Sequence, residues 1–484
     1  MNSEEILQLG AFEIARRVRE RSLRAHDVVD AHIERIRSCN GVLNALIADR
    51  FAAAREEAVQ ADRLADTGST KPLLGVPFVV KDGLSIAGQP LTAGSMRRAG
   101  LVATEDATAV ARLRGAGAIP LGLTNTSELG FWVETDNPLY GRTRNPWDLE
   151  RTPGGSSGAD AALVATGGAP FAVGLDRLGA AVISGAMCGV FSHKPTGGLI
   201  PTTGHGPVLA PRLRRHAAVG IVARRPDDIA ALLGILSGPD GLDETAQTFA
   251  LGDSQAVDFA WRRVLVCDGL GLLGNRPTRS IRRALKMAGT VLKGQGAELE
   301  YWRPSQFARA GEIWLALTHE AYGLHDNFGR AVAEQARLSL SVELLRGAVG
   351  RPRHSAPTLA MAALERVTKG SYHRIQHFCA EGRRLQQRME TMLQDGGLLL
   401  MPAWPDIAPH HGGTLRHPRA ALYAGLMNVL EFPCTHVPMG QGAHDMPVGI
   451  MLVGARGADA TCLAAAQVLE RKLGRWRPIR PSEE

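Results

Sequence analysis

Segments typical of strands and of helices alternate along nearly the whole chain of 484 residues. Short apolar runs such as LLGVPFVVKDG, WRRVLVCDG and AELEYW predict buried strands, whereas longer stretches with apolar residues three and four positions apart predict helices. The sequence shows no internal repeat, low-complexity tract or evident linker between these segments. The alternation therefore favours one α/β body over several separable modules.

The predicted elements are distributed unevenly along this body. Residues 1–66 predict helices, and residues 303–395 are again helical in pattern. Residues 145–205 are unusually dense in Gly, Ser and Thr and predict loop, helix and turn. The C-terminal region predicts three strands, GLLLMPAW, EFPCTHVPM and PVGIMLVG, followed by the helix DATCLAAAQVLERKLG.

Composition excludes several classes of protein. Hydrophobic residues make up 45% and charged residues 21%, which is typical of a folded globular chain, and no apolar run reaches the roughly 18 residues of a membrane-spanning helix. The start, MNSEEILQLG, lacks the basic and apolar regions of a signal peptide. Six scattered cysteines predict free thiols in a reducing cytoplasm, and the net charge of +7 is dispersed. We therefore expect a cytoplasmic protein that binds neither nucleic acid nor membrane.

Lysine is rare in this chain, and one lysine follows a predicted buried strand. Only seven of the 55 basic residues are Lys, and Lys81 ends the apolar run GVPFVVK. Burial lowers the pKa of a lysine toward neutrality, so that its amine becomes a usable base, whereas arginine in effect stays charged. Lys81 is therefore a candidate functional amine, although most lysines lie at the surface.

A second candidate lies in the segment TPGGSSG, where GGSSG fits the nucleophile pattern G-x-S-x-G with Ser156 at its centre. That pattern normally follows a strand directly, but here NPWDLERTP predicts a loop, so the motif alone is weak evidence. Thr152, Ser156 and Ser157 nevertheless precede the apolar helix ADAALVATGG. A row of hydroxyls at a helix start is a plausible place to hold a carbonyl or to relay a proton.

Together these segments resemble the amidase signature family. LLGVPFVVKDGLSIAGQPLTAGS is similar to its lysine-bearing strand, and residues 124–198 are similar, without a gap, to its defining segment. MNVLEFPCTHVPMG and MPVGIMLVGARGADATCLAAAQVLE are similar to its C-terminal strands and final helix. The resemblance implies one domain over 1–484, with a central mixed β-sheet covered by helices on both faces. Its motif-bearing core falls at about 75–240 and 395–475, and about 240–395 would be variable helices of the substrate region.

The resemblance also implies a catalytic triad in which a lysine, a bridging serine held by a cis peptide, and a nucleophilic serine act in sequence. The lysine falls on Lys81, the bridging serine on Ser156 with Ser157 beside it, and the nucleophile on Ala180. Backbone N–H groups before the nucleophile form the oxyanion hole in such a site. These groups would belong to Arg177, Leu178, Gly179 and Ala180.

Several residues around position 180 depart from the family pattern GTDxGGSxRxPA. Leu175 stands in place of Thr, Leu178 in place of Gly, Ala180 in place of the nucleophilic Ser, Val182 in place of Arg and Ser184 in place of Pro. One Ser→Ala change would indicate a laboratory knockout. Five changes in one segment indicate instead a sequence that gave up acyl-enzyme chemistry.

Three hypotheses remain open on the sequence alone. In the first, Lys81 and Ser156 act as an acid–base pair on a small amide or acyl substrate, in an addition, elimination, cyclisation or amide-bond reaction without acylation. In the second, the chain is a pseudoamidase that serves as a binding or regulatory subunit. In the third, it is an amide hydrolase whose nucleophile has moved to Ser156, with Ser184 a poorer candidate.

The substrate itself is not specified by the sequence. Substrate contacts are predicted at four residues, Thr152, Asp176, Arg177 and Ser184. Arg177 is a cation that could meet a carboxylate, and three arginines in HGPVLAPRLRRH could border the mouth of the site: Arg212, Arg214 and Arg215. Neither a metal nor an organic cofactor is expected, and a homodimer is implied only by the family resemblance.

Overall fold

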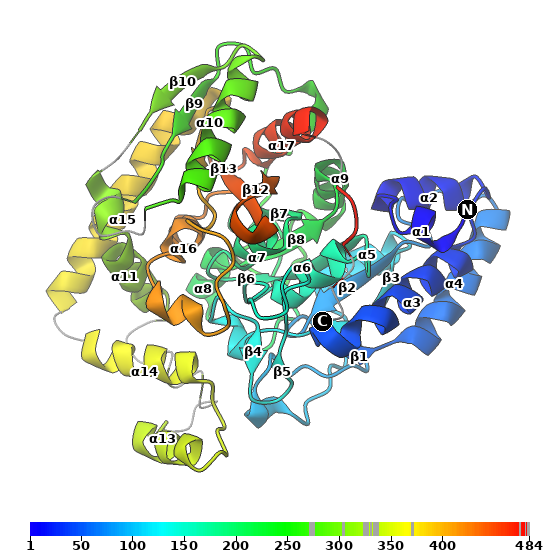
Figure 1. Cartoon of the computed structure of the whole chain (residues 1–484), viewed down its shortest axis with the longest axis horizontal. Coiled ribbons are helices and arrows are strands. Elements are labelled where there is room, and N and C mark those ends of the chain that lie inside the picture. The colour runs from blue at the N-terminus through cyan, green and yellow to red at the C-terminus, as the bar shows by residue number, and fades with distance from the viewer. Residues whose placement is uncertain are drawn as a thin grey trace.

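The structure is a computed structural model of the whole chain (Figure 1). It describes residues 1–484 except 271–275, 303–304, 323–328, 330–331, 333–337, 369–371, 474–475, 480 and 482–484. Within the described residues, the α/β prediction is confirmed, since the chain forms one domain around a mixed sheet with helices on both faces.

Eleven strands of the described part form the central sheet. In sheet order they are β1 (Leu46–Asp49), β3 (Ile119–Thr124), β2 (Pro77–Lys81), β6 (Phe171–Asp176), β8 (Ala218–Ala223), β7 (Phe191–Lys194), β12 (Cys434–Gln441), β13 (Pro447–Gly454), β11 (Leu398–Met401), β9 (Arg263–Val266) and β10 (Glu298–Tyr301). Strand β2 runs parallel to both of its neighbours, whereas β6 and β8 are antiparallel. Strands β4 (Asp136–Asn137) and β5 (Gly141–Arg142) form a separate small hairpin.

Helices lie on both faces of this sheet and at its two ends (Figure 1). The N-terminal helices gather near β1 at one end: α1 (Ser3–Ile6), α2 (Ala11–Arg19), α3 (Ala25–Leu43) and α4 (Phe51–Asp66). One face carries the row α5 (Thr108–Gly115), α9 (Pro226–Leu236), α17 (Asp459–Leu473) and α10 (Arg279–Lys293). The other face carries α6 (Gly158–Ala165) and α7 (Ala180–Cys188).

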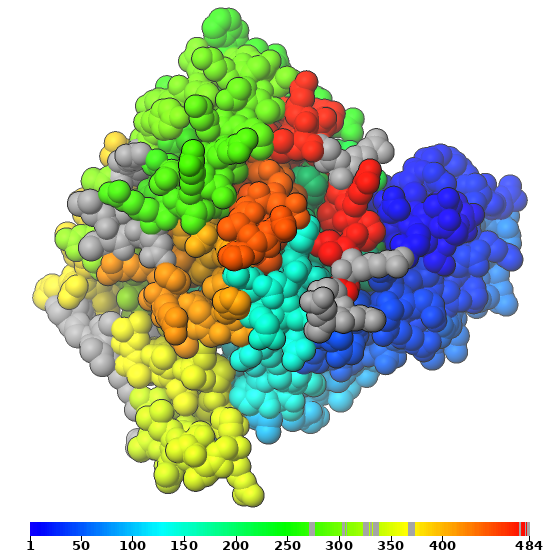
Figure 2. Space-filling view, in the orientation of Figure 1, coloured from blue at the N-terminus to red at the C-terminus, as the bar shows by residue number. Residues whose placement is uncertain are grey.

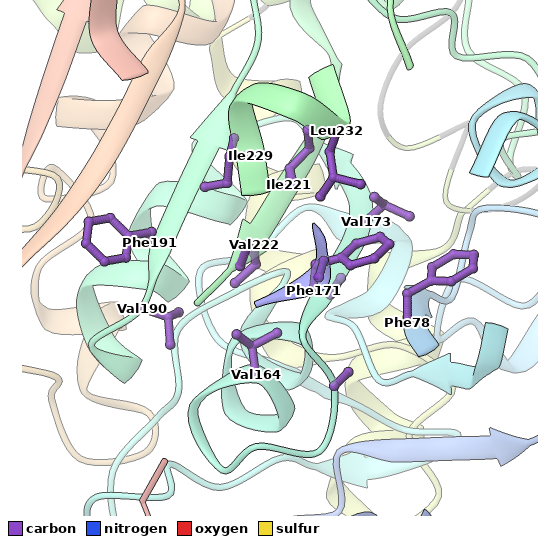
Figure 3. Packing of buried hydrophobic residues seen from close by; sticks show 14 of the residues in the cluster. Phe78, Val164, Phe171, Val173, Val190, Phe191, Ile221, Val222, Ile229 and Leu232 are labelled. Atoms are coloured by element: carbon purple, nitrogen blue, oxygen red, sulfur yellow. The ribbon is translucent and has the colours of Figure 1, made fainter. Parts of the chain in front are cut away.

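Along the central strands, side chains point alternately to the two faces of the sheet, and helices cover both faces. Figure 3 shows Ile221 of β8 directed toward Leu232 of α9, while its neighbour Val222 is directed the opposite way, toward Val164 of α6. Successive strand side chains point to opposite faces, so a continuous apolar strand must be buried on both. Phe78 of β2 and Phe171 of β6 stack in this core with ring centroids 5.2 Å apart.

The remaining helices build a lobe over one end of the sheet: α8 (Pro211–His216), α11 (Ala310–Tyr322), α13 (Leu340–Ala348), α14 (Ala356–Thr368), α15 (Tyr372–Leu393) and α16 (Leu422–Val429). Helices α13 and α14, shown in yellow in Figure 2, project from the body of the molecule. Among the described helices, none combines the length and the apolar character that crossing a bilayer requires.

The sequence-based element predictions are confirmed for β2, for the three C-terminal strands and for α17, and they are wrong in two regions. Residues 1–66 contain a strand, β1, that pairs antiparallel with β3. Residues 145–205 contain β6 and β7, which were not predicted. In β7, His193 and Lys194 are fully buried, and the His193 ring contacts the distant Asp459 carboxylate at 3.1 Å. Such a strand depends on partners far away in sequence, so local pattern does not reveal it.

Candidate active site

Lys81 ends strand β2 and is only 2% exposed. Its Nζ donates hydrogen bonds to Ser156 Oγ at 2.7 Å, to Ser157 Oγ at 3.0 Å and to the carbonyl oxygen of Leu175 at 2.7 Å. These three acceptors match the three N–H groups of an ammonium. Lys81 is therefore a buried, fully hydrogen-bonded cation in this structure.

Ser156 and Ser157 lie in the loop that leads into α6, and each is 1% exposed. The peptide bond between Gly155 and Ser156 is cis, which is where the family resemblance implied a cis bond. Ser156 Oγ also donates to the carbonyl oxygen of Gly130 at 3.2 Å. The Ser156 hydroxyl thus connects the Lys81 amine to the loop that carries Gly130 and Phe131.

Asp160, on the first turn of α6, places a carboxylate beside this cluster. Burial lowers the pKa of Lys81 to about 8, an effect that the charges of Asp160 and Asp176 oppose and that Arg177 reinforces. Burial likewise raises the pKa of Asp160 to about 6, and the Lys81 charge opposes that rise. We refer to Lys81, Ser156, Ser157 and Asp160 as the relay cluster.

Gly174 on β6 makes room for the lysine side chain. A Cβ atom at this position would lie 2.6 Å from Lys81 Cβ and 3.0 Å from Asp160 Oδ2. Contacts below about 3.0 Å force neighbouring atoms to move, so any larger residue here would displace Lys81 or Asp160. The glycine is therefore a structural requirement of the relay cluster.

Position 180 is the first residue of α7, and the structure fixes the backbone around it tightly. Gly179 has a φ of 80°, and a Cβ added there would lie 2.1 Å from Ala424 Cβ. The Asp176 carboxylate accepts hydrogen bonds from the N–H groups of Gly179 and Ala181, both at 2.7 Å, and from Asn428 Nδ2 at 3.0 Å.

Two sequence-based assignments change in the light of these contacts. Gly179 was expected among the oxyanion donors, but its N–H is directed to Asp176. Asp176 was expected to contact substrate, but it is fully buried and holds the start of α7 in place. The remaining candidate donors for an oxyanion are the backbone N–H groups of Arg177, Leu178 and Ala180.

Thr152 and Ser184 are also fully buried. The Thr152 N–H donates to the Pro409 carbonyl at 3.0 Å, and its hydroxyl accepts from the Gly154 N–H at 3.1 Å. These bonds anchor the Thr152 loop to protein partners, and a substrate contact by Thr152 stays a prediction. Ser184 lies one turn into α7, as expected, and its hydroxyl has no hydrogen-bond partner among the described residues.

An apolar cavity of about 400 Å³ opens beside this centre. Its lining comes from the loop residues Phe131 and Trp132, from Leu178, from Phe307 in the 3-10 turn Ser305–Arg309, and from α11, α14 and α16, which contribute Trp314, Leu315, Met361, Leu364 and Leu422 among others. Leu178, one of the residues that departs from the family pattern, therefore forms part of the cavity wall. A cavity of this size with mostly apolar walls is suited to a hydrophobic group of a small-molecule ligand.

The arginines expected near the mouth of the site are mostly paired. Arg214 contacts Asp243 at 3.4 Å, and Arg215 contacts Glu431 at 2.5 Å, while Arg212 is exposed. None of the three lines the cavity. Within the described residues, no group of three or more His, Cys, Asp or Glu side chains has the arrangement of a metal site.

Three residues of the site had not been predicted from the sequence: Asp160, Phe131 and Trp132. Asp160 follows Ser156 by four residues and falls on the first turn of the helix that was predicted after GGSSG. This spacing could have indicated that its carboxylate lies near the serines. The aromatic pair had no such signal, because its place in the cavity wall depends on helices from residues 305–368.

Comparison with known proteins gives a consistent match over the chain. A family model described as Amidase matches residues 27–463. The chain is 33% identical over 485 residues to fatty-acid amide hydrolase 2-B of Danio rerio, which covers 97% of this chain and 90% of that protein. Two solved structures are similar over nearly their full lengths.

The first of these is 6-aminohexanoate cyclic dimer hydrolase, with a TM-score of 0.80, 26% identity and coverage of 98% of this chain and 99% of that one. The second is a vestigial protein complex that reveals the evolutionary origins of an s-triazine catabolic enzyme, with a TM-score of 0.81, 25% identity and coverage of 97% and 100%. The range matched by the family model includes the residues of the relay cluster and the start of α7.

Proposed function

Because the chain belongs to the amidase family, we propose that it binds amides and acts on them through Lys81 and Ser156, without forming an acyl-enzyme at position 180. An alanine methyl group has no lone pair, so Ala180 cannot attack a carbonyl. The proposal therefore needs an acid–base route that dispenses with an attacking side chain.

The observation that carries the proposal is the hydrogen-bonded relay cluster close to an alanine at position 180. Lys81 Nζ lies 2.7 Å from Ser156 Oγ and 3.0 Å from Ser157 Oγ, with all three residues at most 2% exposed. A buried ammonium is costly unless it is paired or hydrogen-bonded, and its pKa of about 8 leaves part of the population neutral near physiological pH. A neutral amine at this distance can accept the Ser156 proton.

In the proposed reaction, a water molecule takes the place of the missing hydroxyl. As the water oxygen attacks the amide carbon, its proton passes to Ser156 Oγ, and the Ser156 proton passes to neutral Lys81 Nζ. The developing oxyanion is held by backbone N–H groups at the start of α7. Lys81 then returns a proton through Ser156 to the leaving nitrogen, the C–N bond breaks, and an acid and an amine are released.

The cavity supports an apolar substituent on the amide. Its walls are largely aromatic and aliphatic, and Leu178 joins the cavity wall directly to the α7 start. The relative from Danio rerio is named as a hydrolase of fatty-acid amides, which are ligands of this kind. We therefore place the acyl chain in the cavity and the amide carbonyl between Ser156 and Ala180.

The decisive experiment treats the wild-type protein and the Ala180→Ser variant with a fluorophosphonate probe, and locates any label by peptide mass spectrometry. We expect no label on the wild type and label on the introduced serine in the variant. This result would show that the relay cluster still activates a hydroxyl placed at position 180.

The two other hypotheses give different outcomes in the same experiment. Label on wild-type Ser156 or Ser184 would indicate a relocated nucleophile and would overturn the proposal. No label on either protein would indicate a relay that no longer activates a hydroxyl. That result would favour the pseudoamidase, a role for which the similarity to a chain in a vestigial complex supplies a precedent.

A further inference from the structure

Arg177 is a largely but not fully buried cation, and no ion pair joins it to a carboxylate among the described residues. Its Nε and Nη2 atoms are buried and have no hydrogen-bond partner among the described residues. The guanidinium carbon lies 4.5 Å from the centre of the Phe131 ring, a contact that stabilises the charge only in part. Burial lowers the pKa of Arg177 to about 10, and it remains charged at neutral pH.

Arg177 lies close enough to Lys81 and to Tyr322 for its charge to act on both groups. Phe131, on which it stacks, lines both the main cavity and a smaller recess that Tyr322 also lines. The Tyr322 hydroxyl is itself buried and has no hydrogen-bond partner among the described residues.

Three unpartnered donor groups therefore converge at one junction: Arg177 Nε, Arg177 Nη2 and Tyr322 Oη. Buried charged atoms without a hydrogen-bond partner cost several kcal/mol in free energy of folding, so these atoms call for a partner such as a ligand. The planar guanidinium fork matches a carboxylate, with which it forms two parallel hydrogen bonds.

We propose that Arg177, assisted by Tyr322, binds a carboxylate on the ligand, and that the ligand is an amide of the N-acyl amino acid class. Such a molecule carries an apolar acyl chain, an amide and a carboxylate within a few bonds of one another. These groups correspond in turn to the cavity, the relay cluster and Arg177. The assignment rests on the proposed function, because it places the amide at the relay cluster.

The test is a calorimetric titration of the protein with N-dodecanoylglycine and with its neutral primary amide, which differ only in the carboxylate. We expect the wild type to bind the acid about tenfold to a hundredfold more tightly, as charge-assisted hydrogen bonds predict. In Arg177→Met this preference should disappear while the neutral amide binds at least as well as before. Tyr322→Phe should reduce the preference by about tenfold or less.

Matched variants separate Arg177 from other cations. Arg212→Met removes an exposed arginine on α8 and should leave the preference unchanged. Arg419→Met removes an arginine that lines the cavity. The inference would be overturned if Arg419→Met abolished the preference for the acid and Arg177→Met did not. Thermal melting confirms that each variant is folded before titration.

The outcomes distinguish this inference from the proposed function. Equal binding of the acid and the amide by the wild type would overturn the carboxylate site and leave the labelling result as the test of the relay. Absence of binding by either compound would also overturn the inference, whatever the fluorophosphonate experiment shows.

Discussion

Two neighbouring segments of the candidate site differ in chemical character. Residues 156–160 place two hydroxyls and a carboxylate around Lys81: Ser156 and Ser157 accept hydrogen bonds from Lys81 Nζ, and the buried Asp160 carboxylate accepts one from Thr124. Residues 175–184 are largely apolar, with Leu178 in the cavity wall and Ala180 at the helix start. In the proposed function, the first segment moves protons, whereas position 180 supplies no attacking atom.

The proposed function implies that proton transfer and nucleophilic attack are separable in such a site. Gly179 has a left-handed conformation, and Asp176 accepts hydrogen bonds from two N–H groups of the turn, so the start of α7 is held in place with an alanine at position 180. A hydrogen-bonded relay beside such a turn is the arrangement that we expect if water supplies the attacking oxygen.

The substitution with the largest expected effect removes the proposed base, Lys81. In the Ala180→Ser background, Lys81→Met should slow fluorophosphonate labelling of the introduced serine by about a hundredfold to ten-thousandfold, because general-base catalysis typically contributes that factor. Labelling rates measured under pseudo-first-order conditions provide the readout. Lys293→Met, on the exposed end of α10, is the control and should label at the parent rate. Equal rates in the Lys81 and Lys293 variants would show that the relay does not pass through Lys81.

Part of this site followed from the sequence, because each relevant signal was local. Lys81 ends an uninterrupted apolar run, and Ser156 and Ser157 lie between glycines before an apolar helix. Lysine scarcity was a weaker signal, since Lys194 is as deeply buried as Lys81 but donates only to the adjacent Pro195 carbonyl among the described contacts. Lys81 was singled out by three signals together: its place at the end of a strand, the serines at a helix start, and the family resemblance that links them.

The rest depended on tertiary contacts that no local pattern records. The turn role of Asp176 involves a hydrogen bond from the distant Asn428, and the Arg177 guanidinium packs on the ring of Phe131, which is also distant in sequence. The fold shows a similar limit: β2 and the three C-terminal strands were predicted from their apolar runs, whereas β6, despite its apolar residues, and β7, whose polar side chains are satisfied by distant partners, were not. Buried polar groups need hydrogen-bond partners, and a local sequence pattern does not reveal which distant residues supply them.

A second test examines whether the relay depends on the lobe above it. His354 Nδ1 contacts Glu128 Oε1 at 2.6 Å with both side chains fully buried, and Ser355 N–H donates to the same carboxylate at 2.7 Å. Glu128 lies two residues before Gly130, the acceptor of the Ser156 hydroxyl. We expect His354→Ala to lower the free energy of unfolding by about 1–3 kcal/mol, because it leaves a buried carboxylate without one partner.

Urea unfolding measures that loss, and labelling of the Ala180→Ser background measures its effect on the relay, which should slow several-fold. His377→Ala is the matched control, because His377 is 63% exposed and lies 3.9 Å from Glu381. Its effect on stability should stay below about 0.5 kcal/mol. If His354→Ala destabilises the protein but leaves the labelling rate unchanged, the relay cluster is independent of the lobe.

The smallest expected effect is the most specific, because two substitutions should move one titration in opposite directions. Labelling of the Ala180→Ser background requires neutral Lys81, so its rate should rise with pH through about 8. Asp160 is ionised in this range, since its raised pKa of about 6 lies below it, and its charge favours the ammonium. Asp160→Asn should therefore move the rise to lower pH, by about one pH unit. Arg177→Met removes a charge that disfavours the ammonium and should move the rise to higher pH by a smaller amount.

Rate profiles from pH 6 to 10, corrected for spontaneous hydrolysis of the probe, measure these shifts. Asp227→Asn removes an exposed carboxylate on α9 and should leave the profile unchanged. Opposite shifts would show that the Lys81 amine is the titrating base and that both flanking charges act on it directly. Shifts of the same sign in the two variants would mean that another group limits the reaction, because a single base placed between an anion and a cation must respond to their removal with opposite signs.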